Sequence, residues 1–461
     1  MQYLFLLFIG APLITFALSS RKKLVYYILA TAAIPVTMFM PSTVFFDFIG
    51  GVNAQAAYLF LIFIALIIAA LRTRERSLGR LRVLFPFVLF LVFAAASLLW
   101  SGDSIHGLRF LIKLLTPTLM LFVASSVLAS DQDLKTAQRM MLLCCFVVLG
   151  VAIVNLALGG GIGGQEIRLK WLARGYLAAP YMGPAPFSFL MSIGAIICLS
   201  RYMAYRDLPN GVMAGVLLLA IVMAFTRISL GGIVVASGAC SLVLARTALV
   251  RYVVPALLVV SFIAMTFLYQ PLYSRMFFEN SNVGLSTTLA APENLARAIN
   301  SSGRTALWEA AFEEFRDFSA YGGGGLGSTD GWLNAKEGRE QLHSGYLTLF
   351  FDLGIVGLGL FVFALANAVV WCYQINFAVP YKRGKIHQAC SVAGLIFYAI
   401  TLVTDNSINY VTEIGIYVFA LLAISVVVAR RERQSRRRLS YECAHGLRSR
   451  SAGRISVQHY N

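Results

Sequence analysis

The sequence predicts an all-α polytopic membrane protein of about 12–13 transmembrane helices with one long structured external loop. Of its 461 residues, 59% are hydrophobic and only 13% are charged, whereas soluble domains carry about 25% charged residues. The mean hydropathy is +0.75, and the apolar residues come in runs of roughly 17–22, the length that crosses a hydrocarbon core of about 30 Å. One long polar segment, from residue 270 to residue 343, interrupts this pattern.

The predicted spans are apolar runs bounded by basic or polar loops. The first run has no basic leader before it and no small-residue cleavage site after it, so we predict a span and not a signal peptide. No internal repeat and no second globular domain is indicated. In chain order the spans are expected at about 2–19, 24–40, 55–71, 83–99, 108–129, 141–158, 181–200, 211–226, 229–246, 252–269, 345–371, 388–404 and 411–428.

The orientation follows from the alternation of loops rich and poor in Lys and Arg, because basic loops stay on the cytoplasmic side. This parity predicts an external N-terminus, a cytoplasmic C-terminus and an external long loop. The chain then divides into a transmembrane bundle, a large periplasmic loop with an amphipathic helix, C-terminal transmembrane helices and a basic cytoplasmic tail, at 1–269, 270–343, 344–428 and 429–461.

The composition also excludes several classes of function. The net charge of +17 lies mostly in short loops and the tail, where it meets anionic headgroups, so no nucleic-acid partner is predicted. None of the seven cysteines lies in the long loop, and neither a disulfide framework nor a metal site is indicated. The chain lacks an HExxH helix and a Gly-x-Ser-x-Gly elbow, and no Asp-x-Asp is found in the predicted external loops that could hold a sugar-nucleotide metal, so no cofactor is predicted.

The long loop is predicted to be structured. Over residues 303–318 apolar side chains recur at helical spacing and acidic ones occupy the other face, as in an amphipathic helix with Ser301 or Ser302 as its N-cap. The glycines at 322–325 are expected to form a flexible turn. Without a Walker lysine they are a weak phosphate signal, and a plain connector is at least as good an interpretation.

Arg304 and His343, at the two ends of this segment, are the predicted chemical centre. Arginine binds phosphate oxygens with a rigid fork of donors, and histidine accepts a proton near neutral pH. Arg227 joins two predicted spans with no acidic residue nearby, which favours a polar cavity over headgroup anchoring. For Arg168 and Lys170 in the 159–180 loop, and for Arg109 and Lys113, snorkelling to headgroups remains an equal alternative.

Four strings in this region resemble one family. They are Ser302-Gly-Arg-Thr-Ala-Leu-Trp308, Gly325-Leu-Gly327, His343-Ser-Gly-Tyr346 and Asp352-Leu-Gly-Ile-Val-Gly357, and their order and spacing resemble the core of the O-antigen ligase and polymerase superfamily. The resemblance covers roughly residues 220–370. The external N-terminus departs from the ligases, in which both ends usually lie inside.

The resemblance implies a metal-independent, inverting glycosyltransferase of the bacterial inner membrane, with its active site facing the periplasm. Its donor would be a glycan linked to undecaprenyl diphosphate, and its acceptor lipid A–core or a growing glycan. The family's arginines would map onto Arg227 and Arg304 and its histidine onto His343. Substrate contacts are expected from residues of the same motifs and of the smaller outer loop: Arg168, Lys170, Arg174, Trp308 and Tyr346.

Three functions therefore remain open. We expect an O-antigen ligase acting on lipid A–core. A polymerase of O-antigen or exopolysaccharide repeat units would use the same donor with a different acceptor, and the sequence does not separate the two. A transporter of lipid-linked glycans is the less favoured alternative, because few ionisable residues lie inside the spans and no paired half-helices are evident.

Overall fold

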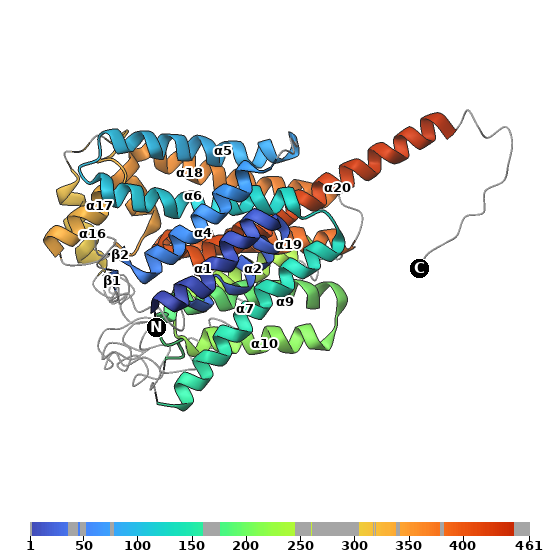
Figure 1. Cartoon of the computed structure of the whole chain (residues 1–461), viewed down its shortest axis with the longest axis horizontal. Helices are drawn as coiled ribbons and strands as arrows, with labels where there is room; N and C mark the ends of the chain where they lie inside the picture. The colour runs from blue at the N-terminus through green and yellow to red at the C-terminus, as the bar shows by residue number, and fades with distance from the viewer. Residues whose placement is uncertain are drawn as a thin grey trace.

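The computed structural model shows a bundle of long, roughly aligned helices (Figure 1). It describes residues 2–35, 45–46, 52–73, 78–159, 176–244, 260, 304–316, 318, 320–337, 342–378 and 382–446. The helices α16 and α17 lie at one end of the bundle, called the loop end here. The C-terminal part of α20 projects from the opposite end, called the basic end (Figure 1).

The predicted spans coincide with helices throughout the described part of the chain, and the all-α membrane fold is confirmed. The predicted span 24–40 begins as a shorter helix, α2, and the predicted span 252–269 falls outside the described residues. A two-residue antiparallel pair, β1 (Phe45–Phe46) with β2 (Val52–Asn53), follows α2. The bundle helices are α1 (Gln2–Ser19), α2 (Arg21–Thr31), α4 (Ala54–Leu71), α5 (Leu78–Ala96), α6 (Ser104–Val127), α7 (Asp131–Ala157), α9 (Pro184–Tyr205), α10 (Leu208–Met223), α11 (Arg227–Leu244), α18 (Gly345–Ala378), α19 (Lys382–Thr404) and α20 (Ile416–Gly446).

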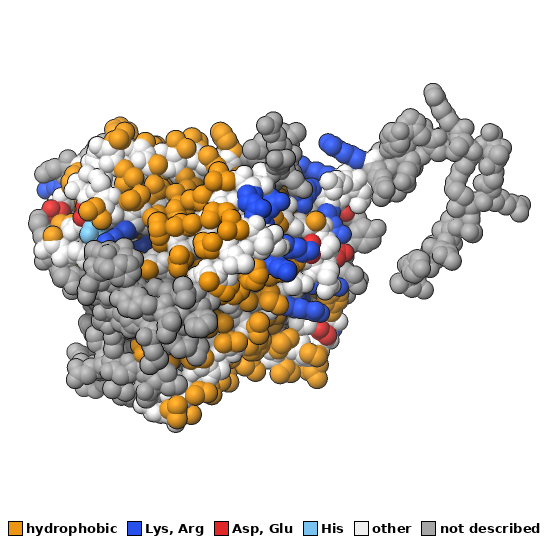
Figure 2. Space-filling view, in the orientation of Figure 1, with side chains coloured by type: hydrophobic (Ala, Val, Ile, Leu, Met, Phe, Trp, Pro, Cys, Tyr) orange, Lys and Arg blue, Asp and Glu red, His pale blue; other side chains and the backbone are white. Residues whose placement is uncertain are grey.

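Apolar side chains cover the middle of the face shown in Figure 2, and basic side chains gather where the bundle ends toward α20. Among the described residues, eight helices are long and apolar enough to cross a membrane, and shorter apolar helices include Gln55–Leu71 and Leu208–Met223. The charged ends and apolar middle are those of a multi-pass membrane protein.

The centre of the bundle is formed by α19 and α20. The most apolar stretch of α20 is buried along its whole length, so it packs against protein on all sides. α19 contacts α9, α11, α18 and α20. Because α19 ends at the loop end in the middle of the bundle, the residues that follow it are placed by several helices at once.

The predicted span 345–371 is not one continuous helix. Gly354 has φ +64° and ψ −170°, values that a residue with a Cβ rarely adopts, and it interrupts α18. The break separates the carbonyls of Phe351 and Asp352 from the amides four residues later. Backbone groups of the loop bond the two carbonyls and the two amides that the break sets free. Gly324 N donates to Phe351 O (2.9 Å) and Gly325 N to Asp352 O (2.8 Å), while Ile355 N donates to Ala320 O (2.8 Å) and Val356 N to Tyr321 O (3.4 Å).

The glycine run is a connector, as one interpretation had it, but it is tightly packed and not an open turn. A Cβ at Gly323 would meet the backbone of Phe351 and Asp352, and one at Gly325 would collide with Ser101. Gly327 has φ +92°, and a Cβ there would collide with the backbone of Gly107 at the start of α6. The glycines therefore allow the loop to lie directly on α6 and α18.

A buried carboxylate joins this loop to α18. Asp352 accepts hydrogen bonds from Gly327 N (2.8 Å), Thr329 N (2.8 Å) and Thr329 Oγ1 (2.6 Å). These donors belong to the first turn of α17 (Ser328–Trp332), whose amide groups have no partner within the helix. Asp352 thus serves as the cap that α17 itself lacks.

The helix predicted within residues 303–318 is present as α16, Arg304–Glu314, but its apolar residues are not confined to one buried face, because Phe312 is 50% exposed. The predicted serine caps fall outside the described residues. The buried face of α16 joins a small second core of Leu307, Ala311, Phe315, Leu333, Leu342 and Phe351. The Phe315 and Phe351 rings stack with centroids 5.1 Å apart. This core fixes α16 against the first turns of α18.

Replacing Gly327 by alanine should lower the stability of the loop end. The left-handed conformation alone costs an alanine about 1–2 kcal/mol, and its Cβ would also collide with the Gly107 backbone. Thermal unfolding of the full-length protein in detergent would measure the loss. Gly150→Ala in α7, where nothing lies within 4 Å of the added Cβ, should melt like the wild type. Equal melting temperatures for the two variants would contradict the packing role of Gly327.

Candidate functional site

Arg227 is the first residue of α11, at the loop end. The turn before it is tight, because Phe225 has φ +50°, a conformation that non-glycine residues seldom adopt. Serine and threonine side chains hold this turn to α9: Thr226 Oγ1 donates to Ser188 Oγ (2.7 Å), which also bonds Ser229 Oγ (2.5 Å). The half-buried Arg227 side chain therefore adds its charge to the positive end of an 18-residue helix.

Arg304 is the first residue of α16 and donates to the backbone carbonyl of Thr404 at the end of α19. Trp308, one turn later, donates through Nε1 to Leu342 O (2.9 Å). α16 is thus tied to α19 at one point and to the residue before His343 at another. These bonds bring together three segments that are far apart in the sequence.

The guanidinium groups of Arg227 and Arg304 are close enough for their positive charges to repel each other. Tyr176, at the end of the predicted 159–180 loop, also acts electrostatically on Arg227, and its ring meets that of Phe225 edge to face, 5.8 Å away. Two cations held side by side cost free energy that an anion between them would recover. The arrangement suits a phosphate or diphosphate.

His343 faces a carboxylate that our sequence reasoning missed. Its Nδ1 lies 3.9 Å from Oδ1 of Asp405. The His343 side chain is 41% exposed although its Nδ1 atom is buried, so the exposed part of the ring lies away from Asp405. A carboxylate behind one ring nitrogen orients a histidine whose other nitrogen can take a proton.

The backbone explains how His343 reaches this position. It adopts φ +55°, which turns the chain sharply just before α18. Gly345 N donates to Asp405 O (3.2 Å), and Ser344 Oγ to Leu402 O (3.5 Å). The start of α18 and the end of α19 therefore form one unit that holds His343 against Asp405.

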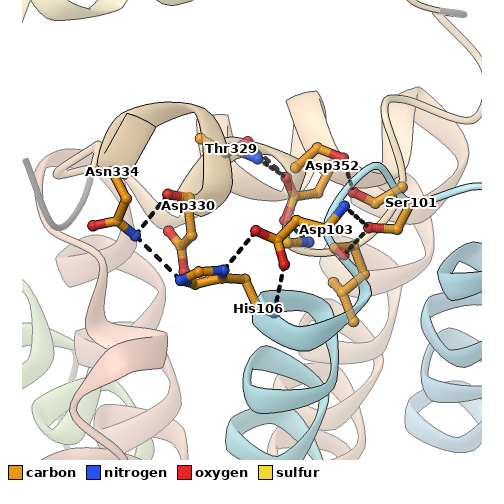
Figure 3. Close-up of polar contacts among 11 residues, drawn as sticks. Ser101, Asp103, His106, Thr329, Asp330, Asn334 and Asp352 are labelled. Atoms are coloured by element: carbon orange, nitrogen blue, oxygen red, sulfur yellow. Dashed lines mark hydrogen bonds and ion pairs between the residues drawn. The ribbon is translucent and has the colours of Figure 1, made fainter. Parts of the chain in front are cut away.

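A second polar cluster lies at the same end, between α6 and α17 (Figure 3). His106 Nδ1 bonds Asp103 Oδ2 (2.7 Å), and Asn334 Nδ2 approaches His106 Nε2 (3.3 Å). Burial raises the pKa of Asp103, but bonds from the backbone and ring of His106 outweigh it and the pKa is lowered.

Asp330 is the most deeply buried acid of this cluster. Burial raises the pKa of its carboxyl, the charges of Lys113 and His106 oppose the shift, and that of Asp103 adds to it. Lys113 Nζ also donates to Asn409 Oδ1 (2.7 Å). Lys113, a weak candidate from the sequence, thus connects the α17 cluster with the turn that follows Asp405.

Several buried polar atoms at the loop end lack a hydrogen-bond partner. Within the part of the chain that the structure describes they are Asp330 Oδ1, Trp332 Nε1, His343 Nδ1, Asn406 Oδ1 and Ser407 Oγ, and others such as Asp207 Oδ1 and Asn376 Oδ1 lie elsewhere in the bundle. Native proteins pair nearly all such atoms with protein or water. A polar substrate bound at the loop end would supply partners for the first group.

The remaining predicted contacts differ in what can be said of them. Arg168, Lys170 and Arg174 lie outside the described residues. Tyr346 donates its hydroxyl to Ala399 O (2.9 Å), which ties α18 to α19. Trp308 is likewise engaged with Leu342. Substrate contact by any of these residues stays a prediction.

The described residues contain no group of three or more His, Cys, Asp or Glu side chains placed to hold a metal ion. The chemistry that they offer is an anion site between Arg227 and Arg304 and a proton acceptor at His343. Asp405 could have been suspected from the sequence, because it is an ionisable residue directly after the predicted span 388–404. Its pairing with His343 joins positions too far apart for a spacing argument.

Comparison with known proteins agrees with this geometry. Residues 212–362 match the family model of the O-antigen ligases, which confirms over that segment the resemblance found in the motifs. The match includes Arg227, Arg304 and His343, whereas Asp405 lies beyond it. A search of curated proteins gave no match. The family indicates a glycosyltransferase-like enzyme, and the apolar helices place it in a membrane.

Asp330→Asn should change how stability depends on pH. A carboxyl whose pKa is raised in the folded protein holds its proton more tightly there than in the unfolded chain, so it stabilises at low pH and loses this contribution as pH rises through the folded pKa. The asparagine, which does not ionise, should therefore gain stability relative to wild type as pH rises from about 4. Melting temperatures of both proteins across this range would measure it.

The difference in melting temperature between Asp330→Asn and the wild type reports on Asp330, because the carboxyl of Asp103 is present in both proteins. The lowered pKa of Asp103 contributes stability that is lost as pH falls, which is the opposite direction. A difference that is constant with pH, or that shrinks as pH rises, would contradict the assignment to Asp330.

Proposed function

Taking the ligase-family match as the premise, we propose that the protein is a glycosyltransferase that moves a glycan from undecaprenyl diphosphate to an acceptor hydroxyl. The observation that carries the proposal is the meeting of Arg227, Arg304 and the His343–Asp405 pair at one end of the bundle. The acceptor in the favoured form is lipid A–core, which makes the protein an O-antigen ligase.

The diphosphate of the donor binds between Arg227 and Arg304. The N-terminus of α11 adds its positive end, as helix N-termini do for phosphate groups. The two charges neutralise the diphosphate as it leaves, and removing one such donor typically costs about 100–1,000-fold in rate. Arg168, Lys170 and Arg174 would add cations around the glycan or its diphosphate.

His343 acts as the general base. The acceptor hydroxyl oxygen attacks the anomeric carbon while its proton passes to the His343 ring. The bond from that carbon to the diphosphate oxygen breaks, and its electron pair leaves on the diphosphate. Attack opposite the leaving group inverts the anomeric configuration. Asp405 holds the ring and stabilises its protonated form, and Trp308 and Tyr346 border the substrate.

The direction of the site follows from the predicted orientation of the chain. With the basic end cytoplasmic, the loop end faces the periplasm, where nucleotide-activated donors are lacking and a preassembled lipid-linked donor is the available activated group. The protein then resides in the bacterial inner membrane with its C-terminal tail in the cytoplasm.

The break in α18 does not favour a transporter. Broken helices in transporters leave backbone groups free to bind ions or substrate. Here the freed groups of Phe351, Asp352 and Ile355 are bonded to the glycine loop, so the break serves to anchor that loop.

Substitutions at His343 and Asp405 should separate catalysis from binding. His343→Ala removes the base and should lower turnover by about 100–10,000-fold with little change in donor KM. Asp405→Asn keeps the shape of the side chain but removes its charge. It should also lower turnover, but by less than His343→Ala. Transfer by purified protein from lipid-linked donor to acceptor, followed with labelled glycan, measures both. A Asp405→Asn protein with wild-type turnover would remove Asp405 from the mechanism.

A deletion strain tests the anion site and the acceptor together. Loss of the protein should remove O-antigen from lipid A–core, with undecaprenyl-linked polymer accumulating. Wild type and Arg139→Gln should restore attachment, because Arg139 is an exposed cation on α7. Arg227→Gln, at matched protein level, should fail to do so.

Two outcomes would change the assignment. Single repeat units on lipid A–core in place of long chains, in the deletion strain, would identify a polymerase of O-antigen or exopolysaccharide. Normal glycan ladders in the Arg227→Gln strain would contradict the diphosphate site in either enzyme.

A further inference from the structure

A separate cavity lies at the basic end, where α5, α18 and α20 meet. It has a volume of about 320 Å³, within the range of about 300–1,000 Å³ usual for small-molecule sites. Arg82 comes from α5 and Gln374 from α18, and α20 supplies the remaining charged walls. The polar lining is Arg82, Trp371, Gln374, Glu432, Arg433 and Arg436.

The lining carries an excess of positive charge. Arg436 bonds Glu432 one turn before it on α20 (Nε to Oε1, 3.1 Å), which neutralises that carboxylate. The other two arginines, Arg82 and Arg433, have no ion pair with any described residue. A cavity with two uncompensated guanidinium groups attracts an anion, and their planar forks suit phosphate oxygens.

Trp371 closes the inner wall of the cavity. Its side chain is 7% exposed, and its Nε1 atom is buried, so the ring contributes shape to this wall while the arginines contribute the charge.

Apolar surface runs from this cavity along both flanking helices. On α5, Arg82 heads a face that continues through the exposed side chains of Phe85, Leu89 and Val92, at spacings of three and four residues. On α18 the exposed Phe363 and Val370 lie on the face of Gln374. The walls are held together, since Asn367 Nδ2 donates to Arg82 O (3.1 Å). Acyl chains could lie along these faces below a headgroup in the cavity.

We propose that this cavity binds the phosphodiester headgroup of an anionic phospholipid whose acyl chains lie on the exposed faces of α5 and α18. Basic pockets between transmembrane helices are suited to such headgroups. A free phosphate would use the same arginines but would gain nothing from the apolar faces. The proposal does not depend on the enzymatic function, because the cavity lies at the opposite end of the bundle from His343.

Native mass spectrometry of the full-length protein in detergent would test it. Dioleoyl phosphatidylglycerol and dioleoyl phosphatidylcholine, added in equal amounts, serve as the probes. Phosphatidylglycerol should bind at least about tenfold more tightly, and the double variant Arg82→Gln/Arg433→Gln should lose this preference, since each charge-assisted bond contributes about a factor of ten or more.

The matched control is Arg139→Gln/Arg206→Gln, which removes two exposed cations outside the cavity and should retain the preference. Equal lipid-free melting temperatures for the variants would show that they are folded. Equal binding of the two lipids by the wild type, or an unchanged preference in the cavity variant, would overturn the proposal. Binding of inorganic phosphate alone at millimolar concentration, with displacement of the lipid, would overturn the lipid source.

Discussion

The loop end depends on an exchange of backbone hydrogen bonds between α18 and the glycine loop. The break at Gly354 separates two carbonyls from the amides that would normally bond them, and unbonded backbone groups inside a membrane cost several kcal/mol each. The loop from Ala320 to Gly325 supplies the missing partners, and it can come close enough because Gly323 and Gly354 lack a Cβ, which would collide with the facing backbone. Neither feature is stable without the other. Together they fix α17 through Asp352 and α16 through the aromatic contacts of Phe351.

On this platform, the end of α19 gathers the reactive groups. Its last carbonyl receives Arg304, and the next residue, Asp405, faces His343. Arg227, the first residue of α11, lies near Arg304, so the N-terminus of α11 is also directed toward this site. Arg227 and Arg304 are close enough for their positive charges to repel each other, and an anion bound between them, as proposed, would relieve this repulsion. His343 directly precedes α18 and Asp405 directly follows α19. The distance between the two side chains therefore depends on how α18 and α19 pack against each other.

The sequence was informative where chemistry and periodicity leave local traces. Apolar runs predicted the helices, and the spacing of Leu307, Ala311 and Phe315 predicted α16. Ionisable residues at span ends made Arg227 and His343 candidates, and Arg304 was a candidate at the start of the loop helix. It was uninformative where function arises from non-local pairing. Asp405 and Asp330 are single acids without a local pattern. The glycine segment was predicted to be a flexible turn. Its tight packing against Ser101 and Gly107 involves residues more than 200 positions away in the chain, and this packing leaves no pattern in the sequence around the glycines. Gly354 sits in an apolar run that hides a helix break.

The long-range nature of the Arg304 contact has a consequence for biogenesis. Arg304 bonds a carbonyl 100 residues further along the chain, and His343 meets its carboxylate only when the following residue, Asp405, has also emerged. A chain still being translated and inserted thus carries its arginines without the framework that aims them. If Arg227, Arg304 and His343 act as proposed, the anion site and the base mature in a single late event, after α19 has docked among its neighbours. Under the proposed mechanism, incomplete chains released by the ribosome are then inactive, whatever helices they have already placed in the bilayer.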